Sequence, residues 1–138
     1  MNIFLTKDNV VKIGDFGIAK IYNLPENEPS PQKNVKSAKA GRVGTPLYLS
    51  PEMIRQNPYD YKIDSWAVGC CIYNLAALEP PFQSEDLNQL AMKILSDTPK
   101  PLDASIYSER LNHFVLEVLL QKEPNMRPYI NQIMRNAC

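Results

Sequence analysis

The sequence predicts a mainly helical α+β fold. Two short runs rich in β-forming residues lie close together near the start of the chain, which is typical of a β-hairpin. Residues 21–43 then lack any sustained hydrophobic period, whereas the remainder has the apolar spacing and the capping residues of helices. We therefore expect a hairpin, a long irregular segment and a group of helices, in that order.

Length and composition limit this fold to one domain or part of one. The chain has 138 residues, of which 44% are apolar and 22% are charged, so a packed core is expected. Fifteen basic residues balance fifteen acidic ones, so we expect no nucleic-acid partner and no membrane-binding surface. No apolar run reaches the roughly 18–20 residues of a membrane span. Three cysteines and one histidine favour a reduced compartment, the cytoplasm or the nucleus, over a disulfide or zinc framework.

The hairpin is expected from the first fourteen residues. Residues 3–5 and 10–13 are rich in β-formers, and Thr6-Lys7-Asp8-Asn9 between them has the chemistry of a turn. The second predicted strand leads directly into Asp15-Phe16-Gly17.

The irregular segment has two halves of opposite charge. Residues 25–31 are acidic and proline-rich, and residues 33–42 are basic and small. This composition predicts a long exposed loop of the kind that is either functional or disordered, with a domain linker as the alternative.

Helices are expected from residue 51 onward. Pro51 is suited to the first position of a helix, with Ser50 as its N-cap and Glu52 in its first turn. Residues 64–78 are apolar at nearly every position, so we expect a helix that is buried on all sides. The proline pair at 80–81 ends it.

Three further helices follow. Ser84 is expected to cap an amphipathic helix, Ser108 is expected to cap a second, and Pro128 is expected to open a short last one. Their apolar stripes are Leu87, Leu90, Ala91, Ile94 and Leu95; then Leu111, Phe114, Val115, Val118 and Leu119; then Ile130, Ile133 and Met134.

Several short motifs occur in a recognisable order. Asn2 precedes Asp15-Phe16-Gly17 by thirteen residues. Residues 44–52 then read GTPLYLSPE, residues 64–69 read DSWAVG, and residues 125–128 read NMRP. The tripeptide alone is a weak signal, but the order and the spacing of the set are specific.

This set resembles the carboxy-terminal lobe of a eukaryotic serine/threonine protein kinase, over essentially all 138 residues. The sequences of residues 2–6, 12–17 and 44–52 are most similar to those of the NIMA-related (never-in-mitosis) kinases. The resemblance implies a partial kinase domain with a hairpin at 1–14, an activation segment at 15–52 and a helical lobe at 53–138.

The resemblance assigns a metal site to the hairpin. It implies that Asn2 and Asp15 supply oxygen ligands to the Mg²⁺ of bound ATP, and that Phe16 packs into the core beside them. It gives Gly17 the backbone freedom to let Asp15 turn inward or outward. Without the resemblance, Asp15 is a turn residue and Asn2 a disordered terminus.

The resemblance assigns the other marked residues to substrate contact and to structure. Thr45 is implied to lie beside the bound protein substrate, with an ordinary turn threonine as the alternative. Glu52 and Arg127 are implied to form a buried ion pair that anchors the activation segment. Asp64 is implied to accept bonds from the catalytic loop, or otherwise to be a helix N-cap, and Trp66 belongs to the core.

The activation segment departs from the family pattern. Gly41 stands where NIMA-related kinases usually carry the activating Ser or Thr, and the segment is longer than usual. Ser37, with basic neighbours, and Ser30, before a proline, are candidate phosphorylation sites; an unmodified polar loop is the alternative.

The sequence lacks the glycine-rich loop, the strand lysine and the His-Arg-Asp aspartate that a kinase needs. We therefore expect part of a kinase that phosphorylates Ser/Thr in proteins, with these 138 residues inactive alone. One alternative is a truncated, pseudokinase-like binding module that sequesters substrates or regulators; another is a gene relic.

The missing parts of the kinase also predict an exposed apolar surface that a partner could cover. In kinases another helix covers the apolar helix at 64–78, so its bare area would exceed what soluble monomers usually expose. We expect a partner that covers this helix, or a chain of marginal stability.

Overall fold

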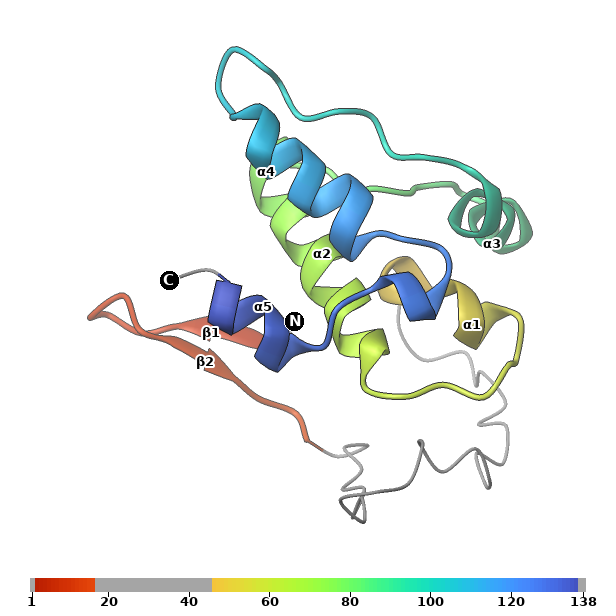
Figure 1. The fold of residues 1–138 in the computed structure, drawn as a ribbon, viewed down its shortest axis with the longest axis horizontal. Helices are drawn as coiled ribbons and strands as arrows, with labels where there is room; N and C mark the ends of the chain where they lie inside the picture. The colour runs from red at the N-terminus through yellow and green to blue at the C-terminus, as the bar shows by residue number, and fades with distance from the viewer. Residues whose placement is uncertain (1, 17–45, 137–138) are drawn as a thin grey trace. The chain divides into compact units, whose positions relative to one another are not determined.

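The structure is a computed structural model that describes residues 2–16 and 46–136 (Figure 1). The chain divides into two compact units, Met1–Pro31 and Gln32–Cys138. The described part of the first unit is a two-stranded sheet, and that of the second is helical. The predicted mainly helical α+β class is therefore confirmed in outline.

The first unit contains an antiparallel hairpin of β1 (Ile3–Leu5) and β2 (Val11–Ile13). Thr6 organises the turn. Its carbonyl accepts the N–H of Asn9 at 3.0 Å, and its Oγ1 accepts the N–H of Val10 at 3.1 Å. The hairpin lies where the sequence predicts it, with a second strand that begins one residue later.

The hairpin by itself does not bury its apolar side chains. All six strand residues are exposed, including Phe4 at 55% and Ile13 at 68%. Because a lone two-stranded sheet is only marginally stable in water, this hairpin needs a further surface against which to pack.

The described part of the second unit opens with a 3₁₀ turn, η1 (Pro46–Tyr48), and the short helix α1 (Pro51–Ile54). Ser50 occupies the N-cap position of α1, as predicted, with an extended backbone. Its side chain does not cap the helix: the hydroxyl is buried and has no hydrogen-bond partner among the described residues. The carbonyl of Ser50 instead accepts the N–H groups of Met53 and Ile54, both at 3.1 Å.

The long helix α2 (Lys62–Ala77), green in Figure 1, runs through the second unit. It begins two residues before the predicted start, so Asp64 lies within its first turn and is not its N-cap. Leu78, which has a left-handed backbone with φ of 58°, ends the helix ahead of the prolines.

Only one side of α2 is buried. Trp66 and Cys70 are fully buried, whereas Val68, Leu75 and Leu78 are 37%, 78% and 88% exposed. The prediction that this helix is buried on all sides is therefore wrong. The described segments that pack on α2 cover one side and leave an apolar stripe in solvent.

Helix α3 (Leu87–Ser96) is amphipathic, as predicted, but its N-cap is Asp86 and not Ser84. The Asp86 carboxylate accepts the N–H of Gln89 at 2.8 Å. Ser84 lies too far upstream to cap and donates instead to the side chain of Gln89 at 3.2 Å.

Helix α4 (Glu109–His113) continues directly into a π-helical segment, η2 (Phe114–Leu119). Ser108 caps α4 as predicted, accepting the N–H of Leu111 at 3.2 Å. The prediction of a single α-helix here is wrong for its second half. There the N–H of Leu120 donates to the carbonyl of Val115, five residues earlier, at 3.0 Å. A π-helix adds one residue to the turn, and a simple 3.6-residue pattern does not reveal it.

Gly69 lets α2 and η2 approach closely. A Cβ atom added at this position would lie 2.8 Å from Cβ of Leu119 and 3.0 Å from Cδ2 of Leu120. Only a residue without a side chain fits between them as they stand.

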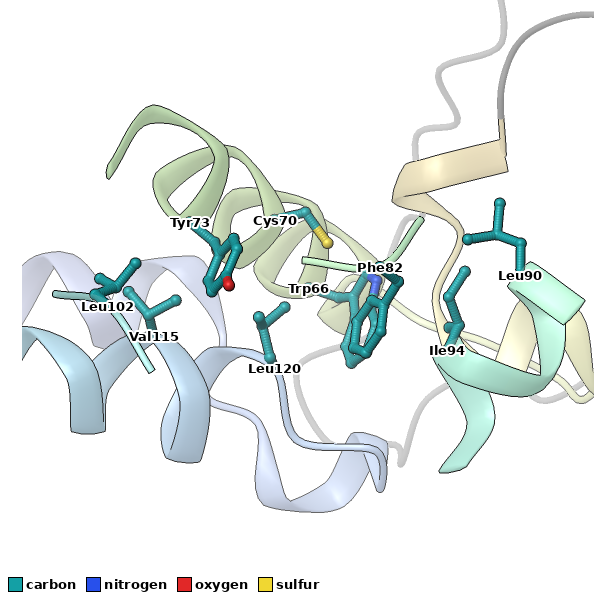
Figure 2. Close-up of a cluster of buried hydrophobic side chains, with 9 residues drawn as sticks. All are labelled: Trp66, Cys70, Tyr73, Phe82, Leu90, Ile94, Leu102, Val115 and Leu120. Carbon is teal, nitrogen blue, oxygen red and sulfur yellow. The ribbon is translucent and has the colours of Figure 1, made fainter. Parts of the chain in front are cut away.

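The core of the helical unit joins α2 to the segments around it (Figure 2). Its buried members come from α2, the loop after it, α3, the loop before α4, η2 and the residue after η2. They are Trp66, Cys70, Tyr73, Phe82, Leu90, Ile94, Leu102, Val115 and Leu120.

The chain then passes through a 3₁₀ turn, η3 (Pro124–Met126), to the last helix, α5 (Ile130–Asn136), two residues after the predicted start. Among the described residues, none of the helices is long and apolar enough to cross a membrane.

Candidate functional site

The hairpin brings Asn2 and Asp15 to the same end of the first unit. The pairing of β1 with β2 is extended by one more bond, from the N–H of Gly14 to the carbonyl of Asn2 at 2.9 Å. Asp15 is the next residue, so the thirteen-residue gap in sequence is closed by the antiparallel register. Both side chains are exposed at this end.

Asp15 has an unusual backbone. Its φ of 62° lies in the left-handed region, which residues other than glycine adopt rarely, although Asp and Asn adopt it more readily. Residues held there cost free energy and cluster at functional sites. Asn9, Gln56 and Leu78 share this conformation among the described residues.

Gly14, beside Asp15, lies in close contact with the ring of Phe4. A Cβ atom at residue 14 would lie 2.8 Å from Cε2 of Phe4, so the aromatic ring of Phe4 lies directly against the glycine. A larger residue would push this ring away from the strand end that carries Asn2 and Asp15.

The chemistry of this pair fits a hard cation. One carboxylate and one amide oxygen are donors that Mg²⁺ accepts, and Mg²⁺ usually takes only one or two protein ligands, with phosphates and water completing its shell. Within residues 2–16 and 46–136, this end of the hairpin included, no three His, Cys, Asp or Glu side chains gather where they could hold a metal.

The prediction for Phe16 is wrong for the described residues. The ring was expected in the core, but it is 67% exposed. The two-stranded hairpin has no second layer under which the ring could pack.

Four other expected site residues lie outside the described residues. Gly17 follows Phe16 directly, Thr45 precedes the 3₁₀ turn at residue 46, and the candidate phosphorylation sites Ser30 and Ser37 lie between them. Their roles stay predictions.

In the second unit, Glu52 and Arg127 form an ion pair. Oε2 of Glu52 and an Nη of Arg127 are 2.5 Å apart, and the two residues are 2% and 1% exposed. The other Nη of Arg127 donates to the carbonyl of Lys62 at 2.9 Å, and the guanidinium lies 5.5 Å from the centre of the Trp66 ring. This is the pairing that the resemblance implies, and it links α1 to the start of α2 and to the segment at η3.

Two residues that sequence reasoning missed reinforce this link. The buried Lys62 donates from Nζ to the carbonyl of Asn125 at 3.3 Å, and Ser65 Oγ donates to the carbonyl of Pro128 at 2.7 Å. Both bonds join the first turn of α2 to the segment that includes η3 and Arg127. Because the acceptors are backbone carbonyls, no residue type at positions 125 or 128 signals them in the sequence.

Asp64 and Trp66 lie in different environments on α2. The Asp64 side chain is exposed among the described residues, yet partial burial of its carboxyl group raises its pKa above the ordinary value. Trp66 is fully buried, and its ring stacks on that of Phe82 with centroids 6.0 Å apart.

The two cysteines of α2 have thiols of low reactivity. Burial raises the pKa of the Cys70 thiol to about 12, so this sulfur stays protonated and unreactive at neutral pH. Burial also raises the pKa of the neighbouring Cys71.

Comparison with known proteins agrees with the motifs. A family model described as "Protein kinase domain" matches residues 1–137. The chain is 35% identical over 134 residues to serine/threonine-protein kinase Nek4 of Mus musculus, covering 97% of this chain and 15% of the relative. It is 41% identical over 138 residues to serine/threonine-protein kinase Nek8 of Danio rerio, covering 99% of this chain and 18% of the relative.

A third relative extends the same group. Serine/threonine-protein kinase Nek1 of Mus musculus is 39% identical over 136 residues, with 99% of this chain and 10% of the relative covered. The chain therefore spans less than a fifth of the length of these three relatives.

Proposed function

Since this chain belongs to the protein kinase family, we propose that it is part of a NIMA-related serine/threonine kinase that transfers the γ-phosphate of ATP to Ser and Thr hydroxyls of proteins. The observation that carries the proposal is the pairing of Asn2 with the strand end at Gly14 and Asp15. This bond puts Asn2 and Asp15 at the same end of the hairpin, and the backbone of Asp15 lies in the left-handed region.

The proposed division of the chain follows the kinase motifs. Residues 1–14 form the hairpin, residues 15–52 the activation segment and residues 53–138 the helical carboxy-terminal lobe. In support, the Glu52–Arg127 ion pair joins the end of the proposed activation segment to the helical unit. Thr45 would contact the protein substrate, and Ser30 and Ser37 would be sites of regulatory phosphorylation.

In this proposal Asn2 and Asp15 hold Mg²⁺ on the phosphates of ATP, with Gly17 allowing the adjoining backbone to move. The cation supplies charge neutralisation at the phosphates. The carboxylate of Asp15 fixes the position of that charge, and the amide oxygen of Asn2 completes the protein's share of the coordination shell.

The 138 residues alone are proposed to be inactive. They contain no His-Arg-Asp aspartate to accept the substrate hydroxyl proton and no glycine-rich loop to enclose the phosphates. Reduced Cys70 and Cys71 fit a cytoplasmic or nuclear protein, and that location is also a proposal.

One observation favours a second function, that of a truncated binding module. Val68 and Leu75 lie seven residues apart on α2, Leu78 follows its end, and the three side chains are 37%, 78% and 88% exposed. Exposed apolar side chains of this kind need a covering surface. In the first proposal that surface belongs to the rest of the kinase, and in the second it belongs to another protein.

The 5′ end of the transcript separates the two functions. The kinase proposal expects an in-frame His-Arg-Asp and glycine-rich loop upstream of residue 1, and ATP-dependent phosphorylation by the extended product. The 138-residue chain, assayed in parallel, serves as the control without these parts. In-frame stop codons directly upstream, or an extended product without transferase activity, would overturn the kinase proposal and leave the binding module.

A further inference from the structure

The ion pair between Glu52 and Arg127 uses only one oxygen of the carboxylate. Nη2 of Arg127 donates to Oε2 of Glu52 at 2.5 Å, and Nη1 donates to the carbonyl of Lys62 at 2.9 Å. The third guanidinium nitrogen, Nε, and the second carboxylate oxygen, Oε1, have no hydrogen-bond partner among the described residues. The contact is therefore monodentate, whereas pairs of arginine with a carboxylate are frequently bidentate.

The two unpartnered atoms are out of reach of bulk solvent. Glu52 is 2% exposed and Arg127 is 1% exposed. A buried donor or acceptor without a partner costs its full desolvation free energy, and the cost is larger for a charged group. Folded proteins therefore satisfy nearly all such atoms with other protein atoms or with ordered water.

The unpartnered nitrogen and the unpartnered oxygen flank the same contact. Nε–H and one N–H of Nη2 point outward from the same edge of the planar guanidinium. Nε of Arg127 therefore lies beside the bond from Nη2 to Oε2. Oε1 of Glu52 is joined to the same carbon as Oε2, so it also lies next to this bond. One donor and one acceptor thus lie close together at this edge without a direct bond between them.

The other buried side-chain polar atoms without a partner belong to neighbours of this pair. Within the described ranges they are Oγ of Ser50 and Nε1 of Trp66. Ser50 precedes Glu52 by two residues, at the N-cap of α1. The ring of Trp66, drawn in Figure 2, has the Arg127 guanidinium 5.5 Å from its centre. The unpartnered atoms are therefore concentrated around one ion pair and are not scattered through the core.

We propose that one buried water molecule bridges Nε of Arg127 to Oε1 of Glu52 and is a fixed part of this ion pair. The water oxygen accepts the N–H of Nε, and one of its O–H groups donates to Oε1. A cation would be repelled by the N–H group and an anion by the carboxylate, whereas water satisfies both. Buried waters make about three hydrogen bonds, and the Ser50 hydroxyl is the candidate for the third.

The ion pair between Arg55 and Glu123 is the matched control. It joins the same two residue types at 3.6 Å, but its side chains are 38% and 70% exposed. Water molecules at this second pair exchange freely with the solvent. A long-lived water is therefore expected at Arg127 and not at Arg55.

The first test is a crystal structure of the full-length protein at a resolution that shows ordered waters. We expect a water within about 2.7–3.2 Å of both Nε of Arg127 and Oε1 of Glu52. The second test is NMR in solution on protein labelled with ¹⁵N at arginine. Paired NOE and ROE measurements separate a bound water from proton exchange. Nε–H of Arg127 should show the cross-peak signs of a long-lived water, and Nε–H of Arg55 should not.

Three results would overturn the proposal. The first is a direct hydrogen bond from Nε of Arg127 to Oε1 of Glu52. The second is another protein group bonded to these two atoms in place of a water. The third is a water signal at Arg127 no longer-lived than that at Arg55. None of these results depends on phosphoryl transfer, so failure here leaves the proposed function unaffected.

Discussion

The carboxylate of Glu52 and the guanidinium of Arg127 are in contact at 2.5 Å although 75 residues separate them in the chain. Both side chains are almost fully buried, so the charge of each is neutralised mainly by the other. The pair joins α1 to the segment at η3, and the bond from Arg127 to the Lys62 carbonyl extends this link to α2.

Replacing Arg127 by Met should destabilise the helical unit by about 3–5 kcal/mol, because Glu52 would remain buried without a counter-charge. Arg55→Met is the matched control. Arg55 is paired with Glu123 at 3.6 Å in an exposed position, where such a pair contributes about 1 kcal/mol or less. Urea unfolding of both variants measures the difference. Equal costs for the two substitutions would mean that the buried pair does not anchor the unit.

Gly69→Ala should lower the free energy of unfolding by about 1–2 kcal/mol. Alanine raises helix propensity by up to about 1 kcal/mol, but overpacking costs typically 1–3 kcal/mol. We expect the cost of the clash to exceed the gain in helix propensity, because Cβ of Leu119, at 2.8 Å, is fixed to the backbone and cannot rotate away. Val68→Ala, on the exposed side of the same helix, should change stability by about 0.5 kcal/mol or less. A stabilised Gly69→Ala protein would show that α2 and η2 do not pack this closely.

Asp86→Ala should cost about 1 kcal/mol through loss of the α3 N-cap. Ser84→Ala should cost much less, since Ser84 bonds only to an exposed side chain. Thermal unfolding of the two single variants distinguishes the residues. A larger loss of stability for Ser84→Ala than for Asp86→Ala would mean that Ser84 is the N-cap.

Stability should rise with pH between about 8 and 9 because of Lys122. Burial lowers its folded-state pKa to about 8, so over this range the unfolded chain binds more protons than the folded one. The shift corresponds to about 3 kcal/mol when complete, and partial exposure of the side chain reduces this to about 1–2 kcal/mol. Above about pH 9 the effect is opposed by Cys70, whose folded-state pKa is raised to about 12.

Lys122→Met isolates this contribution. It keeps a flexible apolar chain over the aromatic rings of Phe82 and Trp66 and removes the titrating group. Urea unfolding at pH 7, 8 and 9 should show the rise for the natural chain and a flatter profile for the variant. Parallel profiles for the two proteins would assign the pH dependence to other groups.

Local chemistry predicted much of the fold because local bonds determine it. The hairpin follows from two β-forming runs around Thr6, and the start of α4 follows from Ser108, whose hydroxyl bonds three residues ahead. The same reasoning failed at Ser84 because two candidate caps lie two residues apart, and geometry favours Asp86.

Features that depend on contacts between distant segments were not accessible in this way. The π-helical turn of η2 accompanies close packing on Gly69, and the exposure of Leu75 and Leu78 depends on what covers α2. The environment of Lys122 is assembled from Trp66, Phe82 and Ile94, whose positions in the chain carry no common pattern.

The candidate metal site could be predicted from the sequence only in part. The resemblance to kinases implies Asn2 and Asp15 as its ligands, and the structure adds the Gly14–Asn2 bond and the left-handed backbone of Asp15. The prediction that Phe16 packs inward is wrong because the hairpin alone cannot cover the ring.

Phosphoryl transfer by the extended kinase domain is the measurement that tests our proposal that Asp15 holds the catalytic Mg²⁺. Asp15→Asn keeps the shape of the side chain and removes its charge, and Asp8→Asn makes the same change at an exposed position in the hairpin turn. We predict that Asp15→Asn lowers kcat by at least about a hundredfold at saturating Mg²⁺, as expected when charge stabilisation of the transferring phosphoryl group is lost. Asp8→Asn should leave kcat unchanged. Full activity of Asp15→Asn would contradict the assignment of this residue as a metal ligand.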